Sequence, residues 1–159
     1  MNLPRLAVTP LRALLVLFFA LLVMLQTLSL PGMFWHWARE DPDFEPLKWP
    51  MTIASIVVLL CVELVIVCTW QLLTLVKDDR IFSDDAFRWV DAIVGAIVVA
   101  EVAVGALLVY AYFNWDDPGI GVLMMLGLLG GAVLGLLMIV LRALLRQATT
   151  LRTDMEAVI

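Results

Sequence analysis

The stretch KDDRIFSDDAFR, residues 77–88, separates two long apolar segments at residues 51–76 and 87–113. Each segment exceeds the roughly 20 residues that a helix needs to cross a bilayer. Ser83 is a suitable N-cap for the second helix, and the two aspartates that follow it would complement the dipole of the first turn. The polar turn before Ser83 therefore predicts an antiparallel helical hairpin.

Two further apolar segments flank this hairpin, and the composition agrees with a membrane protein. Hydrophobic residues make up 64% of the 159 residues, charged residues make up 16%, and the mean hydropathy is +1.03. Apolar segments without period-2 alternation cross lipid as helices, because helices satisfy their own backbone hydrogen bonds. We predict an all-α polytopic membrane protein of one domain, residues 1–159. It forms an antiparallel four-helix bundle with spans at about 11–30, 51–76, 87–113 and 120–145, and a tail at 146–159.

The basic residues predict the orientation of these spans. With both termini inside, eight of the ten Lys and Arg residues lie on the cytoplasmic side, and only Arg39 and Lys48 lie outside. We therefore expect a multi-pass protein of the bacterial inner membrane with both termini cytoplasmic. The first span ends at Leu30 without a small-x-small cleavage site, which favours an uncleaved signal anchor.

The residue types exclude most catalytic chemistry. One histidine and two cysteines are too few for a haem pair, a structural zinc site or a disulfide framework, and no phosphate-binding loop occurs. We predict no enzyme activity, no catalytic, cofactor-binding or metal-binding residues, and no direct binding of nucleic acid. The outer loop at residues 31–50 contains His36 and an acidic run, which either bind a cation or form a solvated negative cap.

Two carboxylates fall inside predicted spans. Glu63 and Glu101 both lie near the bilayer midplane by helical rise, on helices predicted to be antiparallel neighbours. Burial and mutual repulsion favour the protonated acid, so we expect at least one of them to be neutral at pH 7. They form a candidate proton or cation site, or they are neutral acids that hydrogen-bond between helices.

The fourth span carries a stripe of glycines at four-residue spacing, Gly127, Gly131 and Gly135. Small residues allow the backbones of two helices to approach closely in lipid. This candidate packing seam serves either the contact of the fourth helix with its neighbours or a homodimer.

The tail has one apolar face. Its positions recur at spacings of three and four residues and comprise Leu144, Ala148, Leu151, Met155 and Val158. We expect an amphipathic helix that continues the fourth span into the cytoplasm. The apolar face either docks a partner or lies against the bilayer.

Residues 72–88, LLTLVKDDRIFSDDAFR, resemble the signature of a bacterial family of small four-helix membrane proteins known as domain of unknown function 2975. The tail at residues 147–159 is similar to the ending of that family. The resemblance implies a four-span inner-membrane protein without assigned catalytic residues. It also implies a regulatory partnership, because members are often encoded beside a small helix-turn-helix regulator.

These observations favour a non-enzymatic inner-membrane protein of regulatory or scaffolding type. It would anchor a cytoplasmic regulatory protein through the inner loop and the tail, with the lipid bilayer as its other partner. Two alternatives stay open: a small proton-coupled transporter that uses Glu63 and Glu101, and an accessory subunit of a larger membrane complex, in which the glycine stripe would pack against another chain.

Overall fold

The computed structural model describes residues 3–77, 84–114 and 118–158, and the elements in these ranges are all helical. Four stretches are long and apolar enough to cross a membrane: Val8–Glu40, Pro42–Lys77, Asp85–Asn114 and Gly119–Met155. The prediction of an all-α protein with four spans is therefore confirmed. The elements are α1 (Leu3–Met24), the π-helical turn η1 (Leu25–Ser29), α2 (Leu30–Glu40), the 3₁₀ turn η2 (Pro42–Phe44), α3 (Glu45–Lys77), α4 (Asp84–Asn114) and α5 (Pro118–Ala157).

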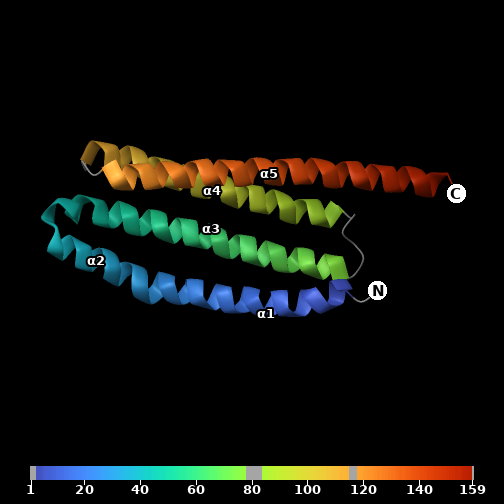
Figure 1. The fold of residues 1–159 in the computed structure, drawn as a ribbon, viewed down its shortest axis with the longest axis horizontal. Coiled ribbons are helices and arrows are strands. Elements are labelled where there is room, and N and C mark those ends of the chain that lie inside the picture. Colours follow the sequence, from blue (N-terminus) through green and yellow to red (C-terminus); the bar gives the residue numbers. More distant parts are fainter. Residues whose placement is uncertain (1–2, 78–83, 115–117, 159) are drawn as a thin grey trace.

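The helices lie side by side in the order in which the chain forms them. Figure 1 shows α1 and α2 along one edge, then α3, then α4, with α5 along the opposite edge. The closest packing joins α1 and α2 to α3, α3 to α4, and α4 to α5. Both ends of the chain lie at the same end of this arrangement, as an even number of crossings requires.

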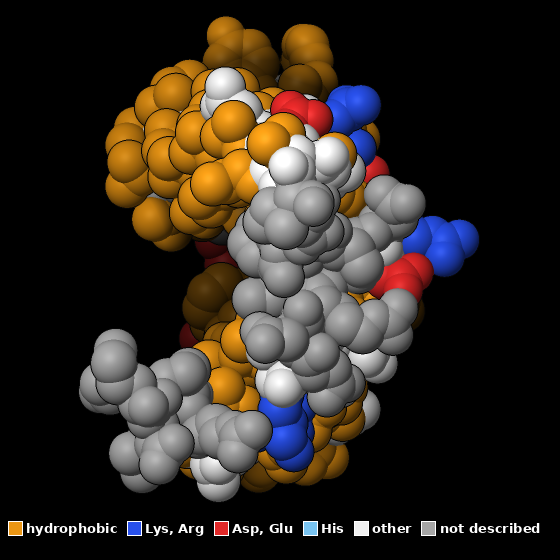
Figure 2. Space-filling view, turned by 90° about the vertical axis from the view of Figure 1, so that its right-hand side faces the viewer, with side chains coloured by type: hydrophobic (Ala, Val, Ile, Leu, Met, Phe, Trp, Pro, Cys, Tyr) orange, Lys and Arg blue, Asp and Glu red, His pale blue; other side chains and the backbone are white. Residues whose placement is uncertain are grey.

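Figure 2 views the molecule from the end that carries the two termini, and the row of helices is curved in this view. Hydrophobic side chains cover most of the described surface, while Lys, Arg, Asp and Glu gather mainly on one side of this end. No residue of α5 whose burial is described is buried, although several are partly covered. An apolar helix with so little protein cover is suited to direct contact with lipid.

The structure corrects the prediction for the segment between the first two spans. Residues 31–50 do not form a loop, because the first helix continues through η1 into α2 and the next helix already begins at Glu45. Within η1, the hydroxyl of Thr27 donates to the carbonyl oxygen of Val23 at 2.8 Å. The wider π turn changes the phase of the helix without ending it.

The actual reversal takes place between Asp41 and Phe44. Asp41 precedes Pro42 and adopts an extended backbone (φ −125°, ψ 107°), which proline imposes on its predecessor. The Asp41 carboxylate accepts a hydrogen bond from the backbone N–H of Asp43 at 3.0 Å. The backbone N–H of Phe44 donates to the carbonyl oxygen of Asp41 at 3.1 Å. This Asx-type turn reverses the chain with only a few residues.

A small hydrophobic core closes the end of the molecule opposite the termini, the outer end in the predicted orientation, around this turn. It contains Leu30 and Phe34 of α2, Phe44, Leu47 and Met51 beyond the turn, and Ala111 of α4. The rings of Phe34 and Phe44 stack with centroids 6.3 Å apart. This core joins residues of four elements, α2, η2, α3 and α4, so it fixes α2 and the start of α3 against α4.

The predicted start of the third span agrees with the structure as far as it is described. Helix α4 begins at Asp84, the residue after the predicted N-cap. Ser83 itself and the rest of residues 78–83 lie outside the described residues, so the expected capping contacts and the tight turn stay predictions.

We predict that Leu47→Ala destabilises the protein by about 2–5 kcal/mol, because Leu47 is completely buried and its truncation leaves a cavity in the outer core. Chemical unfolding in detergent micelles, followed by circular dichroism, measures this change. Leu60→Ala is the matched control, since Leu60 is 50% exposed on the same helix. Equal effects of the two substitutions would contradict the assignment of a core around Leu47.

Candidate functional site

Glu101 of α4 lies directly against Gly131 of α5. A Cβ atom at position 131 would overlap the Oε1 atom of the Glu101 carboxyl group. Only glycine leaves this space free. The carboxyl group of Glu101 therefore packs where a side chain at position 131 would otherwise lie. Glu101 lies about 26 Å along α4 from Asp84 at the usual helical rise, well inside the apolar stretch.

The other glycines of the predicted seam differ in their surroundings. A Cβ atom at Gly135 would lie 3.4 Å from Cγ2 of Ile97 on α4. A Cβ atom at Gly127 would have no neighbour within 4 Å. The α4–α5 contact therefore involves Gly131 and Gly135, whereas Gly127 faces open space.

Glu63 lies on a different flank of the molecule. It shares a helical face of α3 with Val67, Trp70 and Thr74, at spacings of four, seven and eleven residues. Trp70 and Thr74 contact Arg12 of α1. The Oε1 atom of Glu63 is buried and has no hydrogen-bond partner. An ionised carboxylate in this position is costly within a membrane span.

The structure thus places the two intramembrane glutamates at separate helix contacts. Glu101 lies against α5, and Glu63 lies on the face of α3 that contacts α1. No hydrogen bond joins the two carboxyl groups in the described part of the chain.

An ion pair between α4 and α5 lies toward the end that carries the termini. The Arg142 guanidinium contacts both oxygens of Asp91, with Nε 2.7 Å from Oδ1 and Nη2 2.8 Å from Oδ2. Both side chains are about half exposed, so the pair contributes on the order of 0.2–1 kcal/mol. Its bidentate geometry fixes the register of α5 against α4. The distribution of charged residues in the sequence predicted that both residues lie on the inner side, but it did not predict that they pair.

Beyond Arg142 the predicted docking face carries no protein cover. Leu144 is 56% exposed, Leu151 is 61% exposed, and Val158 is 88% exposed. Ala148 and Met155 are exposed as well. Figure 1 shows this part of α5 extending past the ends of α3 and α4. The five apolar residues therefore share a face on a helix that leaves the row of helices.

The outer end holds exposed charges and aromatic rings. The imidazole Nε2 of His36 lies 3.2 Å from Oε1 of Glu40, one helical turn away. The Lys48 ammonium lies 4.3 Å from the ring centroid of Trp35, within cation–π distance. Among the described residues, no group of three or more His, Cys, Asp or Glu side chains could hold a metal ion.

The fold defines a class of protein: a multi-pass, all-helical membrane protein with four apolar helices. The family model described as "Protein of unknown function (DUF2975)" matches residues 32–159. The chain belongs to this family, as the resemblance of the hairpin and the tail predicted. No curated protein and no solved structure gives a significant match to the chain.

We predict that Gly131→Ala weakens the contact between α4 and α5 by about 1–3 kcal/mol, because the added methyl group displaces the Glu101 carboxyl group. Unfolding of the purified variant in detergent measures the change. Gly127→Ala is the control and should be neutral, since its methyl group would meet open space.

The combined substitution Gly131→Ala with Glu101→Ala tests the cause of this effect. Removal of the carboxyl group should relieve the overlap, so the double variant should lose less stability than the two single effects added together. Strict additivity would show that Glu101 and Gly131 do not contact each other.

Proposed function

We propose that this protein is a non-enzymatic inner-membrane component that anchors a cytoplasmic regulatory protein through the projecting end of α5. The observation that carries the proposal is the exposed apolar face on Leu144, Ala148, Leu151, Met155 and Val158. An unpartnered face with anchors at spacings of three and four residues is typical of a helix that binds in a groove of another protein.

The length of α5 supports this proposal. The helix contains 40 residues and is about 60 Å long at the usual rise, twice the roughly 30 Å thickness of a hydrocarbon core. A crossing that begins near Pro118 is therefore complete near Arg142, the first charged residue of α5. The remaining four turns or so extend beyond the hydrocarbon core.

The straightness of α5 favours a partner protein over the bilayer surface as the target of the apolar face. A helix that leaves the membrane and then lies on it must kink, and sharp kinks occur mostly at proline or glycine. The sequence has neither residue after Gly135. The Asp91–Arg142 ion pair also holds the projecting end of α5 against α4 at the point where the projection begins.

The charge distribution supports a cytoplasmic location for the tail. In the sequence, eight of the ten Lys and Arg residues fall in the segments predicted to be cytoplasmic, which include both termini, as the positive-inside rule requires. The partner that suits this face has an apolar groove wide enough for a single helix. A small helix-turn-helix regulator, which family resemblance implies, provides helices that can form such a groove.

Substitution of Leu151→Asp together with Met155→Asp should reduce recovery of the partner by about tenfold or more, since a charge on a buried anchor is poorly tolerated. Tagged protein is cross-linked in cells, solubilised and purified, and the bound proteins are identified by mass spectrometry. Deletion of residues 148–159 should remove the same protein from the sample. Thr153→Asp introduces a negative charge on the opposite face of the helix and should preserve recovery of the partner. Equal recovery with all four chains would contradict docking through the apolar face.

A small proton-coupled transporter is the second candidate function, and the unpartnered buried Oε1 atom of Glu63 favours it. A buried carboxyl oxygen without a hydrogen-bond partner can bind a proton or a cation. A carboxyl group in an apolar span also costs free energy, and a role in transport would explain why the protein contains one there. Glu101, which packs against Gly131, would be a second, separate proton site.

For this candidate, Glu63→Gln should abolish proton-driven flux of lipophilic cations in proteoliposomes while leaving helical content unchanged. Glu101→Gln should reduce the flux if the second site lies on the same route. Glu40→Gln is the matched control, because Glu40 is exposed at the outer end. Absence of flux in the unmodified protein across a panel of cations would eliminate the transporter in favour of the anchor.

A further inference from the structure

Arg12 of α1 is a cation that lies between two helices. Its Nη2 atom donates a hydrogen bond to Oγ1 of Thr74 at 3.0 Å, and its guanidinium carbon lies 5.2 Å from the ring centroid of Trp70. The Nε atom is buried and has no hydrogen-bond partner. No carboxylate pairs with Arg12 in the described part of the chain. Among the described residues its charge is therefore uncompensated, although the side chain is partly buried between two helices.

An apolar groove lies near this arginine, between α1 and α3. The groove has a volume of about 260 Å³ and is lined by Leu15, Val16 and Phe19 of α1 and by Ile66, Val67 and Trp70 of α3. Trp70 thus belongs both to the groove and to the site of the guanidinium. Phe19 lies about 10 Å along the helix from Arg12, so the groove extends from the cation toward the interior of the span.

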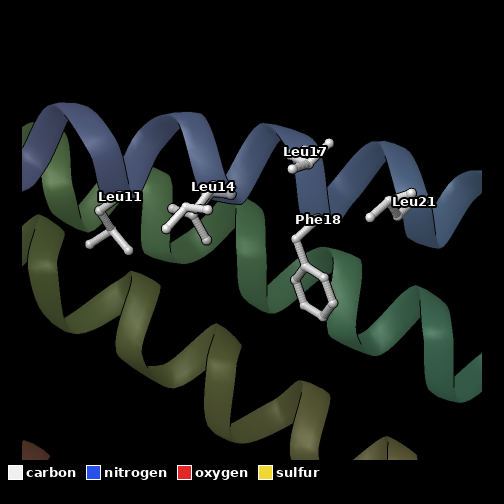
Figure 3. A pocket seen from close by; sticks show the side chains of 6 residues that line it. Leu11, Leu14, Leu17, Phe18 and Leu21 are labelled. Carbon is white, nitrogen blue, oxygen red and sulfur yellow. The ribbon is translucent and has the colours of Figure 1, made fainter.

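A second apolar hollow lies beside the first along α1. It has a volume of about 330 Å³ and is lined by Leu11, Leu14, Leu15, Leu17, Phe18 and Leu21. Figure 3 shows the labelled leucines spaced along α1 and the ring of Phe18 extending from it toward the other helices. Leu15 lines both hollows, and Leu11 and Leu15 flank Arg12 in the chain. Two apolar hollows that share Leu15 therefore lie along α1, close to Arg12 in the chain.

We propose that this part of α1 and α3 is a binding site for an anionic glycerophospholipid. The phosphate pairs with the guanidinium of Arg12, and the two acyl chains occupy the two hollows. A guanidinium matches phosphate oxygens in geometry and charge, and basic positions between membrane helices bind anionic lipid headgroups. Because Arg12 lies at the end where the termini lie, the lipid belongs to the leaflet of that side. This site is independent of the docking face on α5.

The test uses the full chain, purified in detergent and titrated with dioleoyl phosphatidylglycerol or dioleoyl phosphatidylcholine. Native mass spectrometry counts the lipids that stay bound. The acyl chains of the two lipids are identical, so their difference measures the contribution of the headgroup. We expect one retained lipid with a preference of about fivefold for phosphatidylglycerol, the usual contribution of one basic residue near an anionic headgroup.

Arg12→Gln should abolish this preference, whereas Arg146→Gln should preserve it, since Arg146 is exposed on α5 away from the groove. Val16→Trp tests the acyl-chain hollow without changing Arg12, at a position that is 55% exposed and therefore tolerant in folding. It should lower the retention of both lipids by a similar factor.

Three results would overturn the proposal. The first is an unchanged preference for phosphatidylglycerol in a helical, monodisperse Arg12→Gln protein. The second is unchanged retention of lipid by Val16→Trp, which decides the matter even if Arg12→Gln fails to fold. The third is displacement of the bound lipid by inorganic phosphate, which would indicate a site for an anion alone.

Discussion

The contact between α4 and α5 is the constraint on which the position of the projecting end of α5 depends. Helix α5 lies at one edge of the row, and its main packing surface is α4. Glycine at position 131 allows the two backbones to approach with a carboxyl group between them. The Asp91–Arg142 ion pair then sets the register near the end of the contact. Together these two features fix how far α5 extends beyond its neighbours.

A row of helices leaves more surface to the membrane than a closed bundle does. Helices α1 and α5 occupy opposite edges, so each has a long apolar flank that the protein itself does not cover. On α1 this flank includes two hollows beside a cation, and on α5 it leads into an exposed apolar face. The two edges therefore offer different surfaces, one suited to lipid and one suited to a protein.

Hydropathy was sufficient to predict the helical class and the four spans, because these properties depend on composition over about 20 residues. The family was predicted from the resemblance of residues 72–88 and 147–159 to its members. Hydropathy failed at residues 31–50, where charged and aromatic residues lower its value although the backbone stays helical. The short reversal depends on Asp41 before Pro42, a local signal that the loop prediction overlooked. Helix rotation is set by side-chain packing between helices. The surroundings of Glu63, Glu101 and Arg12 could therefore not be predicted from periodicity in one helix.

The most direct test of the central claim is the accessibility of spin labels along residues 144–158 in proteoliposomes. Single cysteines are introduced into a chain whose Cys61 and Cys68 are replaced by alanine, and collision with a water-soluble paramagnetic reagent is measured at each position. A projecting helix predicts that labels on the apolar face and on the opposite face are both accessible from water in the absence of a partner. Protection of the apolar positions alone, with a period of about 3.6 residues, would show that the tail lies on the bilayer and would contradict the proposed anchor.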